Sequence, residues 1–551
     1  MTRAMVHHQW WNLFLLLVIL GLAAYLRLNQ LETLPPPLHV DEAGSALSGL
    51  AVVNGERPLF AYGFTNHLNT AFLLPGLVLD LFGKSVWNLR IIEVVFGLVA
   101  VLFTYLLGRR LFSWRVGVVA ATLLTVNHFA IAFSRLGLVN QQSMTVQVVA
   151  FWLLWEGHAR RRSSLTFMGG VMVGLGLYLY FASWVVPVIL ALFGLWCVIF
   201  RRQAAMEQWR QALWGAAGFV LVCIPWLAFP LLDPEAFQQR PSQVFIIPSL
   251  GSYNEYWGTG NPLQVMWLQV LHNVKIFVVG GDFSNQYGHN APLFFPVTLF
   301  FFVVGLVALA RFRKPRHVFL ALWLGTTLLV GGILTDSPPF MPRLVGMLPV
   351  AMLIAALGVA WSVDLMARLV HRGRLLRFTW NPPINSAAFA GALFLGTFAA
   401  VALLSLVNNH RAYFHEYPVA PHTIWWPWIE PMNSIGSYIE SREDVEQVYM
   451  FSTDDGYVYL HSGHAVIRFY MYGHDARVND VRCRQTPCVI PRPRGRTMYV
   501  LPEDTVHLLE RVERLFPGGA TKRFMGHQSP DGSISEHFVV YEVRESASTS
   551  R

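Results

Sequence analysis

Charged side chains are scarce in this 551-residue chain, in which Asp, Glu, Lys and Arg together make up 13%. The hydrophobic share is 54%, and the mean hydropathy is +0.43. Soluble domains usually carry about 25% charged residues, so this composition excludes a soluble enzyme. The sequence also has no internal repeat, no low-complexity tract and no Gly-rich loop of the kind that cradles phosphates.

Cysteine is rare as well, with four residues in the chain. Cys197 and Cys223 fall in apolar runs, where a small buried role is expected. Cys483 and Cys488 lie in the polar C-terminal region, in the segment Cys-Arg-Gln-Thr-Pro-Cys. A lone pair at this spacing is a weak zinc signal. It predicts a disulfide if the region faces an oxidising compartment.

The chain has instead a succession of apolar runs, each near the ~20 residues that a bilayer requires. The predicted spans are 10–27, 86–108, 116–134, 141–158, 165–182, 184–200, 212–232, 292–310, 317–334, 344–366 and 385–407. The fold class is therefore a polytopic α-helical membrane protein with about 11 transmembrane helices. No small-residue cleavage site follows the first run, so we interpret it as an uncleaved span.

Basic residues cluster in short loops that all fall on one side of this span count. The clusters are Arg109–Arg110, Arg160–Arg162, Arg201–Arg202, Arg311–Lys314 and Arg368–Arg377. By the positive-inside rule this side is the cytoplasm, where the N-terminus then lies. The outer loops 28–85 and 233–291 and the C-terminus lie on the other side. The net charge of +9 is thus an orientation signal rather than a nucleic-acid footprint, and we expect a multi-pass protein of the plasma (inner) membrane.

Two apolar segments of the outer loops are not counted as spans. Segment 68–82 is short and carries Pro75 and Asp80, and segment 264–279 carries His272 and Lys275. Counting either as a span would invert every later loop. Both are predicted to be helices that lie in the plane of the membrane interface.

The composition becomes more polar after residue 407. We therefore divide the chain into a membrane domain at 1–410 and a small extracytoplasmic α/β domain at 411–551. A helix is predicted there at 435–439. Strands are predicted at 447–451, 458–460, 466–470, 498–501 and 537–543.

Asp41 and Glu42 are adjacent carboxylates shortly after the first span. The helix-compatible run 45–53 follows at once, so both are expected at a helix N-terminus, where the dipole and free N–H groups favour the ionised form. A carboxylate held there is suited to orienting or deprotonating a nucleophile at the membrane surface. The alternative is a plain helix cap.

Residues 10–370 contain a series of short segments whose order is similar to that of a known family. The series comprises the first span, the loop with Asp41-Glu42, Leu81-Phe82-Gly83-Lys84-Ser85, Leu89-Arg90, Arg109-Arg110-Leu111-Phe112, Phe133-Ser134-Arg135, and Ser337-Pro338-Pro339-Phe340-Met341-Pro342-Arg343-Leu344 before Leu348-Pro349. This order resembles the GT-C superfamily of integral-membrane glycosyltransferases. It is most similar to the branch of protein O-mannosyltransferases and the lipid A aminoarabinose transferase. The C-terminal domain resembles no family that we can name.

The resemblance implies transfer of a sugar from a polyprenyl-phosphate donor to an acceptor on the outer face, with inversion. Asp41 would be the catalytic base or would orient the acceptor, and Glu42 would assist it. A leaving lipid phosphate needs cations to stabilise its charge, and the candidates are Arg343, Arg135 and Arg90. The alternative to phosphate binding is that each of these arginines extends its side chain to the lipid headgroups. Arg90 is also spaced to pair with a carboxylate at 93.

Substrate-binding candidates are Asn66 and His67 in the first outer loop and Tyr256 and Trp257 in the second. Sugar faces pack on aromatic rings, and amides bond to hydroxyls. The alternatives are a solvated loop histidine and an ordinary interfacial aromatic girdle. His39 beside the two carboxylates suggests a metal, but the outer loops carry no second carboxylate cluster. We therefore expect no metal and no cofactor.

Two other functions compete with transfer. A lipid-linked glycan transporter or flippase would need polar residues along a path through the bilayer, whereas the ionisable residues here gather at the outer edge. A non-catalytic relative that binds a lipid-linked sugar is the third possibility. The expected partners are a polyprenyl-phosphate sugar, membrane lipid and an acceptor, which is a protein, a lipid or a glycan. No nucleic-acid partner is expected.

Overall fold

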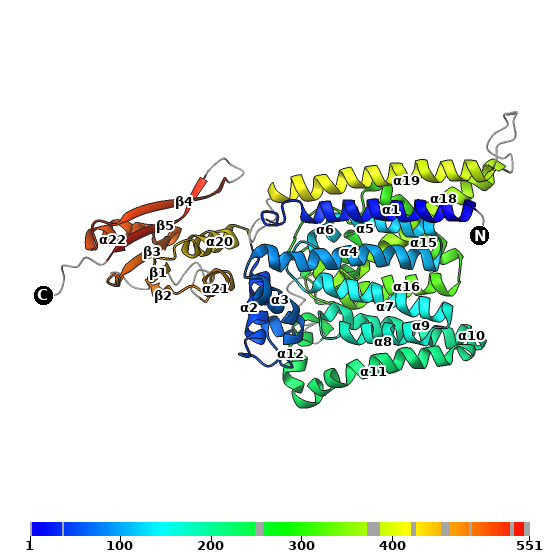
Figure 1. Ribbon diagram of the computed structural model, residues 1–551, viewed down its shortest axis with the longest axis horizontal. Helices are drawn as coiled ribbons and strands as arrows, with labels where there is room; N and C mark the ends of the chain where they lie inside the picture. The colour runs from blue at the N-terminus through cyan, green and yellow to red at the C-terminus, as the bar shows by residue number, and fades with distance from the viewer. Residues whose placement is uncertain are drawn as a thin grey trace.

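A computed structural model describes residues 3–35, 38–247, 257–371, 386–419, 426–452, 463–483, 488–528 and 534–544. Long helices form a bundle, and a small domain with a sheet lies at one end of it (Figure 1). The start of α1 (Arg3–Leu28) and the short helix α10 (Arg202–Glu207) both lie at the opposite end of the bundle. The basic cluster Arg201–Arg202 and the C-terminal domain are therefore at opposite ends, as the predicted topology requires.

Each of the eleven predicted spans overlaps a helix of the bundle. These helices are α1 (Arg3–Leu28), α4 (Val86–Leu111), α5 (Trp114–Val126), α7 (Asn140–Arg160), α8 (Ser163–Gly176), α9 (Val185–Phe200), α11 (Trp209–Leu232), α15 (Pro296–Arg311), α16 (Pro315–Leu328), α18 (Met347–His371) and α19 (Ser386–Arg411). Among the described residues, seven segments are long and apolar enough to cross a membrane. The chain is thus a multi-pass membrane protein, while the count of eleven stays a prediction.

One predicted span, 116–134, is two helices. The helix α5 ends at Val126, and α6 (His128–Phe133) begins again after Asn127. The Asn127 side chain accepts a hydrogen bond from the Ala130 N–H at 3.2 Å, which caps the second helix. The Asn127 side chain therefore interrupts the helix, because it forms a hydrogen bond with a backbone N–H group of the next helix.

The segments between the spans build the end of the bundle that faces the C-terminal domain (Figure 1). They include α2 (Val40–Val53), η1 (Phe64–Asn66), η2 (Asn69–Phe72), α3 (Leu73–Phe82), α12 (Pro234–Val244) and α14 (Pro262–Lys275). The segments 68–82 and 264–279 are therefore helical, as predicted. Their position in the plane of a membrane interface stays a prediction.

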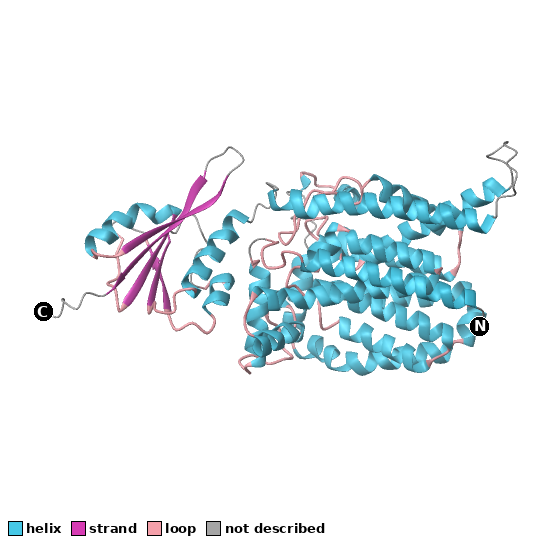
Figure 2. Cartoon of the chain, turned by 45° about the horizontal axis from the view of Figure 1, so that its top comes forward, coloured by secondary structure: helices cyan, strands magenta, loops and turns pink. Residues whose placement is uncertain are grey.

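The C-terminal domain is a mixed sheet with helices on both faces (Figure 2). Its strands are β1 (Gln447–Ser452), β2 (Arg477–Arg482), β3 (Arg496–Pro502), β4 (Ala520–Gln528) and β5 (Ile534–Arg544), in the order β2-β1-β3-β5-β4. The strand β1 is parallel to both neighbours, whereas β5 is antiparallel to β3 and β4. Alternate residues of the central strands enter two separate apolar clusters, one on each face.

The helices of this domain are α20 (Trp426–Glu440), α21 (Ala465–Met471), η8 (Glu503–Leu508) and α22 (Leu509–Leu515). The prediction of a strand at 466–470 is wrong, because this segment is α21. His464 caps it, and Val466, Ile467 and Phe469 are buried on one side. A short apolar run does not by itself distinguish a strand from a buried helix turn. The predicted strand 458–460 lies outside the described residues.

Two further strands, β2 and β4, were not predicted from the sequence. Both lie at the edges of the sheet, and β2 is mostly exposed, so neither shows a clear apolar pattern. The predicted disulfide between Cys483 and Cys488 is confirmed. It closes a short loop directly after β2.

Two glycines allow α2 and α3 to cross in close contact. A Cβ atom added at Gly49 would lie 2.4 Å from the Phe72 carbonyl oxygen and 2.5 Å from the Gly76 nitrogen. Both neighbours are backbone atoms, which a side-chain rotation cannot move away. The close approach therefore requires glycine at position 49.

We expect the substitution Gly49→Ala to lower the free energy of unfolding by about 1–3 kcal/mol, because it overpacks this crossing. Thermal unfolding of the purified protein in detergent measures the effect. Gly21→Ala is the matched control, since nothing lies within 4 Å of a Cβ at Gly21. Equal melting of both variants and the wild type would show that the helices do not approach so closely.

Candidate active site

A cavity lies at the N-terminus of α2. Its wall includes Asp41 and Ser45 from α2, Thr65 and His67 from the first outer loop, and Asn140, Tyr180, Arg240, Gln286 and Phe340 from later segments. Segments far apart in the chain thus converge on one carboxylate. Most of the other groups are neutral hydrogen-bonding or aromatic side chains.

Asp41 lies in the first turn of α2, as predicted, with 23% of its side chain exposed. Gln286 donates a hydrogen bond from Nε2 to Asp41 Oδ2 at 2.7 Å. His39 Nδ1 is 3.6 Å from the same oxygen, but that nitrogen accepts the Asp41 backbone N–H. His39, rather than Asp41, caps the helix.

The loop that carries Gln286 is held by a buried carboxylate, Asp282. Asp282 accepts hydrogen bonds from the Ser284 N–H and hydroxyl and from the backbone N–H groups of Gly288 and Met341. Burial raises the pKa of Asp282, and these hydrogen bonds offset part of that rise. This carboxylate, which looks isolated in the sequence, thus ties the Gln286 loop to the segment before α18.

Glu42 points away from the cavity and is fully buried. Arg90 on α4 donates to both of its oxygens, at 2.9 Å from Nε and 3.0 Å from Nη2. The Gly137 and His39 N–H groups also donate to it, at 2.7 and 3.0 Å. Burial alone would raise the pKa of Glu42, but Arg90 and these hydrogen bonds lower it below its ordinary value. Glu42 is held as an anion by protein groups, so it shapes the site rather than reacting in it.

The three arginines predicted to bind phosphate all have protein partners. Arg90 pairs with Glu42 rather than with the carboxylate at 93, and it also donates to the Leu31 and Pro35 carbonyls. Arg135 is buried and donates to the Leu26 and Leu34 carbonyls at 2.8 Å.

Arg343 lies nearer to the cavity than the other two. It pairs with Asp336, with 2.5 Å between Nη1 and Oδ1, and it also donates to the Asp336 carbonyl. Its guanidinium stacks over Phe340, whose ring lines the cavity wall. A phosphate role for Arg343 would first require the ion pair to open.

Arg240 on α12 is the cation that lines the cavity, and the sequence interpretation missed it. Its guanidinium carbon is 5.8 Å from the centre of the Phe181 ring. In the described part of the chain it forms no ion pair. A signal was available, because Arg240 and Lys275 are the only basic residues in the loop 233–291.

His67 lies beside Arg240 on a tight hairpin. Tyr62 and Leu68 pair as a β-bridge, and Thr65 and Asn66 adopt φ values of 51° and 59° to close the turn. The ring stacks on Tyr180 with 5.2 Å between centroids. Burial, followed by the positive charge of Arg240, lowers the pKa of His67 to about 4. His67 is therefore neutral at pH 7 and adds no second charge to Arg240.

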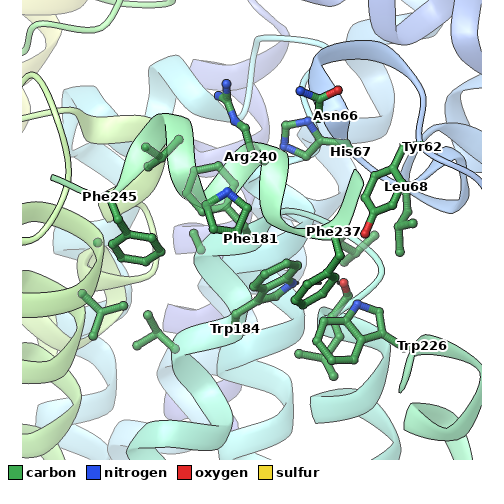
Figure 3. A pocket seen from close by; sticks show the side chains of 18 residues that line it. Tyr62, Asn66, His67, Leu68, Phe181, Trp184, Trp226, Phe237, Arg240 and Phe245 are labelled. Carbon is green, nitrogen blue, oxygen red and sulfur yellow. Dashed lines mark hydrogen bonds between the residues drawn. The ribbon is translucent and has the colours of Figure 1, made fainter. Parts of the chain in front are cut away.

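An apolar groove adjoins the cavity at Arg240 and His67. Both residues line the cavity and the groove, so they form the neck between them. Figure 3 shows Arg240, His67 and Asn66 at one end of the groove and the rings of Trp184, Trp226 and Phe237 at the other. Trp184 and Phe237 stack with 5.7 Å between centroids.

The remaining predicted site residues are placed as follows. Asn66 lines the groove. Tyr256 lies outside the described residues. The Trp257 ring is 4.6 Å from that of His272 on α14, and it does not contribute to the described walls of the cavity or groove. No group of three or more His, Cys, Asp or Glu side chains suited to a metal occurs among the described residues. Metal independence stays a prediction.

The chain is similar to proteins that handle polyprenyl phosphates. The family model for dolichyl-phosphate-mannose-protein mannosyltransferase matches residues 70–229. Undecaprenyl phosphate-alpha-4-amino-4-deoxy-L-arabinose arabinosyl transferases of Pseudomonas paraeruginosa and Pseudomonas aeruginosa are 31% identical over 157 residues. That alignment covers 26% of this chain and 27% of the relatives' own length.

Solved structures share the fold over most of the chain. The crystal structure of ArnT from Cupriavidus metallidurans bound to undecaprenyl phosphate matches with a TM-score of 0.58 and 13% identity, over 97% of this chain and 98% of that one. The Archaeoglobus fulgidus oligosaccharyltransferase in complex with zinc and sulfate gives 0.52 and 16%, over 95% and 73%. The predicted resemblance to GT-C glycosyltransferases related to ArnT and the O-mannosyltransferases is confirmed.

We expect the substitution Glu42→Gln to destabilise the protein by about 3–5 kcal/mol, because it leaves Arg90 buried without its counter-charge. The pKa of Glu42 is lowered in the folded state. The pair therefore stabilises the wild type fully above the ordinary value of 4.5, and this contribution is lost as the pH falls below it.

Thermal unfolding in detergent, at pH 7 and in steps below pH 4.5, measures both effects. Asp41→Asn is the control at the neighbouring position, and it should melt like the wild type. A Glu42→Gln variant as stable as the wild type would contradict the buried ion pair.

Proposed function

We propose that this GT-C membrane protein transfers a sugar from a polyprenyl-phosphate donor to an acceptor, with Asp41 as the base. One observation carries the proposal. Asp41 lines the same cavity as Arg240 and His67, and these two residues also line the adjoining aromatic groove. The carboxylate would act on the acceptor, and the cation would bind the phosphate. The apolar groove would bind the isoprenoid.

The donor would bind with its phosphate at the neck. The Arg240 guanidinium can donate two parallel hydrogen bonds to phosphate oxygens, and it has no competing carboxylate in the described structure. His67 is neutral, so it would add a hydrogen bond through its second ring nitrogen. The isoprenoid would lie in the groove among Trp184, Trp226 and Phe237, where each buried CH₂ contributes about 0.8 kcal/mol.

The sugar would then occupy the cavity between the neck and Asp41. The acceptor oxygen forms a bond to the anomeric carbon as the bond from that carbon to the phosphate oxygen breaks. Asp41 takes the acceptor proton, and the electron pair leaves with the lipid phosphate, which Arg240 stabilises. Because the base and the phosphate are on opposite sides of the sugar, this arrangement favours inversion.

Neighbouring groups of the cavity are suited to hold the sugar ring. The side chains of Asn140 and Gln286 reach the wall, and the rings of Tyr180 and Phe340 offer apolar faces. Gln286 also holds Oδ2 of Asp41, so Oδ1 is the oxygen that would accept the proton. We leave the sugar and the acceptor (protein, lipid or glycan) open.

The proposed place of the reaction is the outer face of the plasma (inner) membrane. The basic clusters predict a cytoplasmic N-terminus and an extracytoplasmic C-terminal domain. The helices α2 and α12, which line the cavity through Asp41, Ser45 and Arg240, lie at the end of the bundle that faces this domain (Figure 1). Transfer is favoured over transport by a flippase because the cavity-lining charges gather at that one end.

We expect Asp41→Asn to lower transfer by about 10²–10⁴-fold, the usual contribution of a general base. The asparagine keeps the shape of the side chain and an oxygen for Gln286, so the fold should persist. The measurement is sugar release by purified wild type and variant from a panel of polyprenyl-phosphate monosaccharides. A variant as active as the wild type would remove Asp41 from the mechanism.

We expect Arg240→Gln to weaken donor binding by about 10–100-fold, since it removes charge-assisted hydrogen bonds to the phosphate. Binding of undecaprenyl phosphate to the purified protein measures this directly. Arg57→Gln is the matched control, because Arg57 is exposed in the first outer loop and lines neither the cavity nor the groove. Equal binding by both variants would place the phosphate elsewhere.

A further inference from the structure

The C-terminal domain packs directly on the helix that carries Asp41. An apolar cluster joins Ala43, Ala46 and Leu50 of α2 with residues of α20 and α21. The members from the C-terminal domain are Met432, Ile435, Ile439, Val466, Ile467 and Phe469. The helix α2 is therefore enclosed between this domain on one side and α3, at the Gly49–Gly76 crossing, on the other.

Polar contacts add to this interface near the C-terminal end of α2. Lys84, just after α3, pairs with Glu440 at 2.7 Å and donates to the Tyr470 carbonyl at 2.6 Å. Asn54, which follows the last residue of α2, donates to the Tyr472 hydroxyl at 2.6 Å. These contacts hold the domain against the membrane bundle.

One contact acts on the backbone that leads into α2. The Leu38 N–H donates to Asn433 Oδ1, and Asn433 Nδ2 donates to the Leu38 carbonyl, both at 3.0 Å. A single amide side chain thus satisfies both polar groups of Leu38, as a neighbouring strand would. The Tyr470 hydroxyl donates to Asn433 Oδ1 at 3.2 Å, which fixes the orientation of the amide.

Leu38 directly precedes His39, the capping residue of α2, and Asp41 lies three positions after Leu38. The direction in which α2 begins therefore depends on where Asn433 holds this backbone. Gln286 fixes the carboxylate from the opposite, membrane-domain side. Asn433 and Gln286 together determine where Asp41 points.

We infer that Asn433 is a positioning residue, through which the C-terminal domain sets Asp41 for proton transfer. This inference rests on the proposed function. It assigns the domain a role in the chemical step and none in holding the donor, because Arg240 and His67 belong to the membrane domain. Misplacing a catalytic group by about 1 Å can cost about 10²-fold in rate.

The test compares full-length variants purified in detergent. For each variant, kcat and KM are measured with the polyprenyl-phosphate sugar that the wild type uses, and Kd is measured for undecaprenyl phosphate. Asn433→Ala should lower kcat by about 10–100-fold and leave Kd unchanged. Asn54→Ala removes an amide contact to the same domain at the other end of α2, and it should leave both values unchanged.

Tyr470→Phe is a second variant, in case Asn433→Ala does not fold. It removes only the hydroxyl that orients Asn433, so it should lower kcat by a smaller factor, again without changing Kd. A fully active Asn433→Ala, or a fully active Tyr470→Phe if the first variant is unfolded, overturns the inference. So does an equal loss in Asn433→Ala and Asn54→Ala, which would indicate general loosening of the interface.

The two proposals fail in different ways. A wild-type protein that turns over no polyprenyl-phosphate sugar overturns the proposed function and, with it, this role of Asn433. An active wild type whose Asp41→Asn variant is silent, together with a fully active Asn433→Ala variant, overturns the positioning role alone.

Discussion

The buried ion pair between Glu42 and Arg90 organises the candidate site. Removing two charges from water is costly unless the geometry is good and the remaining hydrogen-bonding groups are satisfied. Here Glu42 accepts four hydrogen bonds, and Arg90 also binds the carbonyls of Leu31 and Pro35. Through this pair the end of the first helix, the start of α2, the start of α4 and the backbone at Gly137 share one fixed arrangement.

This pair also explains how two adjacent carboxylates have different environments. Successive residues on a helix point about 100° apart, so Asp41 faces the cavity when Glu42 faces the bundle. The charge of Glu42 is compensated by Arg90, whereas Asp41 accepts a hydrogen bond from the Gln286 amide and lines the cavity. Glu42 is therefore part of the buried structure, and Asp41 is the carboxylate that faces the cavity.

Much of the fold could be predicted from the sequence, because the apolar runs and the basic loops each carry a simple physical signal. The position of Asp41 at a helix N-terminus was predictable for the same reason. The partners of Arg90 and Arg135 were not, since they are carboxylate and carbonyl groups brought in from elsewhere in the chain. Arg240 was not predicted, because the phosphate candidates were chosen among arginines at the ends of spans. Arg240 lies within an outer loop instead.

The C-terminal domain was less predictable than the membrane domain. In α21 the run Val466 to Met471 has too few residues to show a helical period, so its burial against α2 decides its conformation. The contact between Asn433 and Leu38 joins residues that are 395 positions apart in the chain. Neither local sequence predicts this contact. The Asn433 amide takes the place of a neighbouring strand, and it reaches Leu38 only when the chain has folded.

The neutrality of His67 has a consequence for turnover. A polyprenyl-phosphate sugar is a phosphodiester with one negative charge, whereas the lipid phosphate released from it is a monoester that approaches two near pH 7. Cationic groups at the neck therefore attract the spent carrier more strongly than the fresh donor. In the proposed reaction, Arg240 would be the cation and His67 is uncharged, so this imbalance would stay small and the spent carrier could exchange for the next donor.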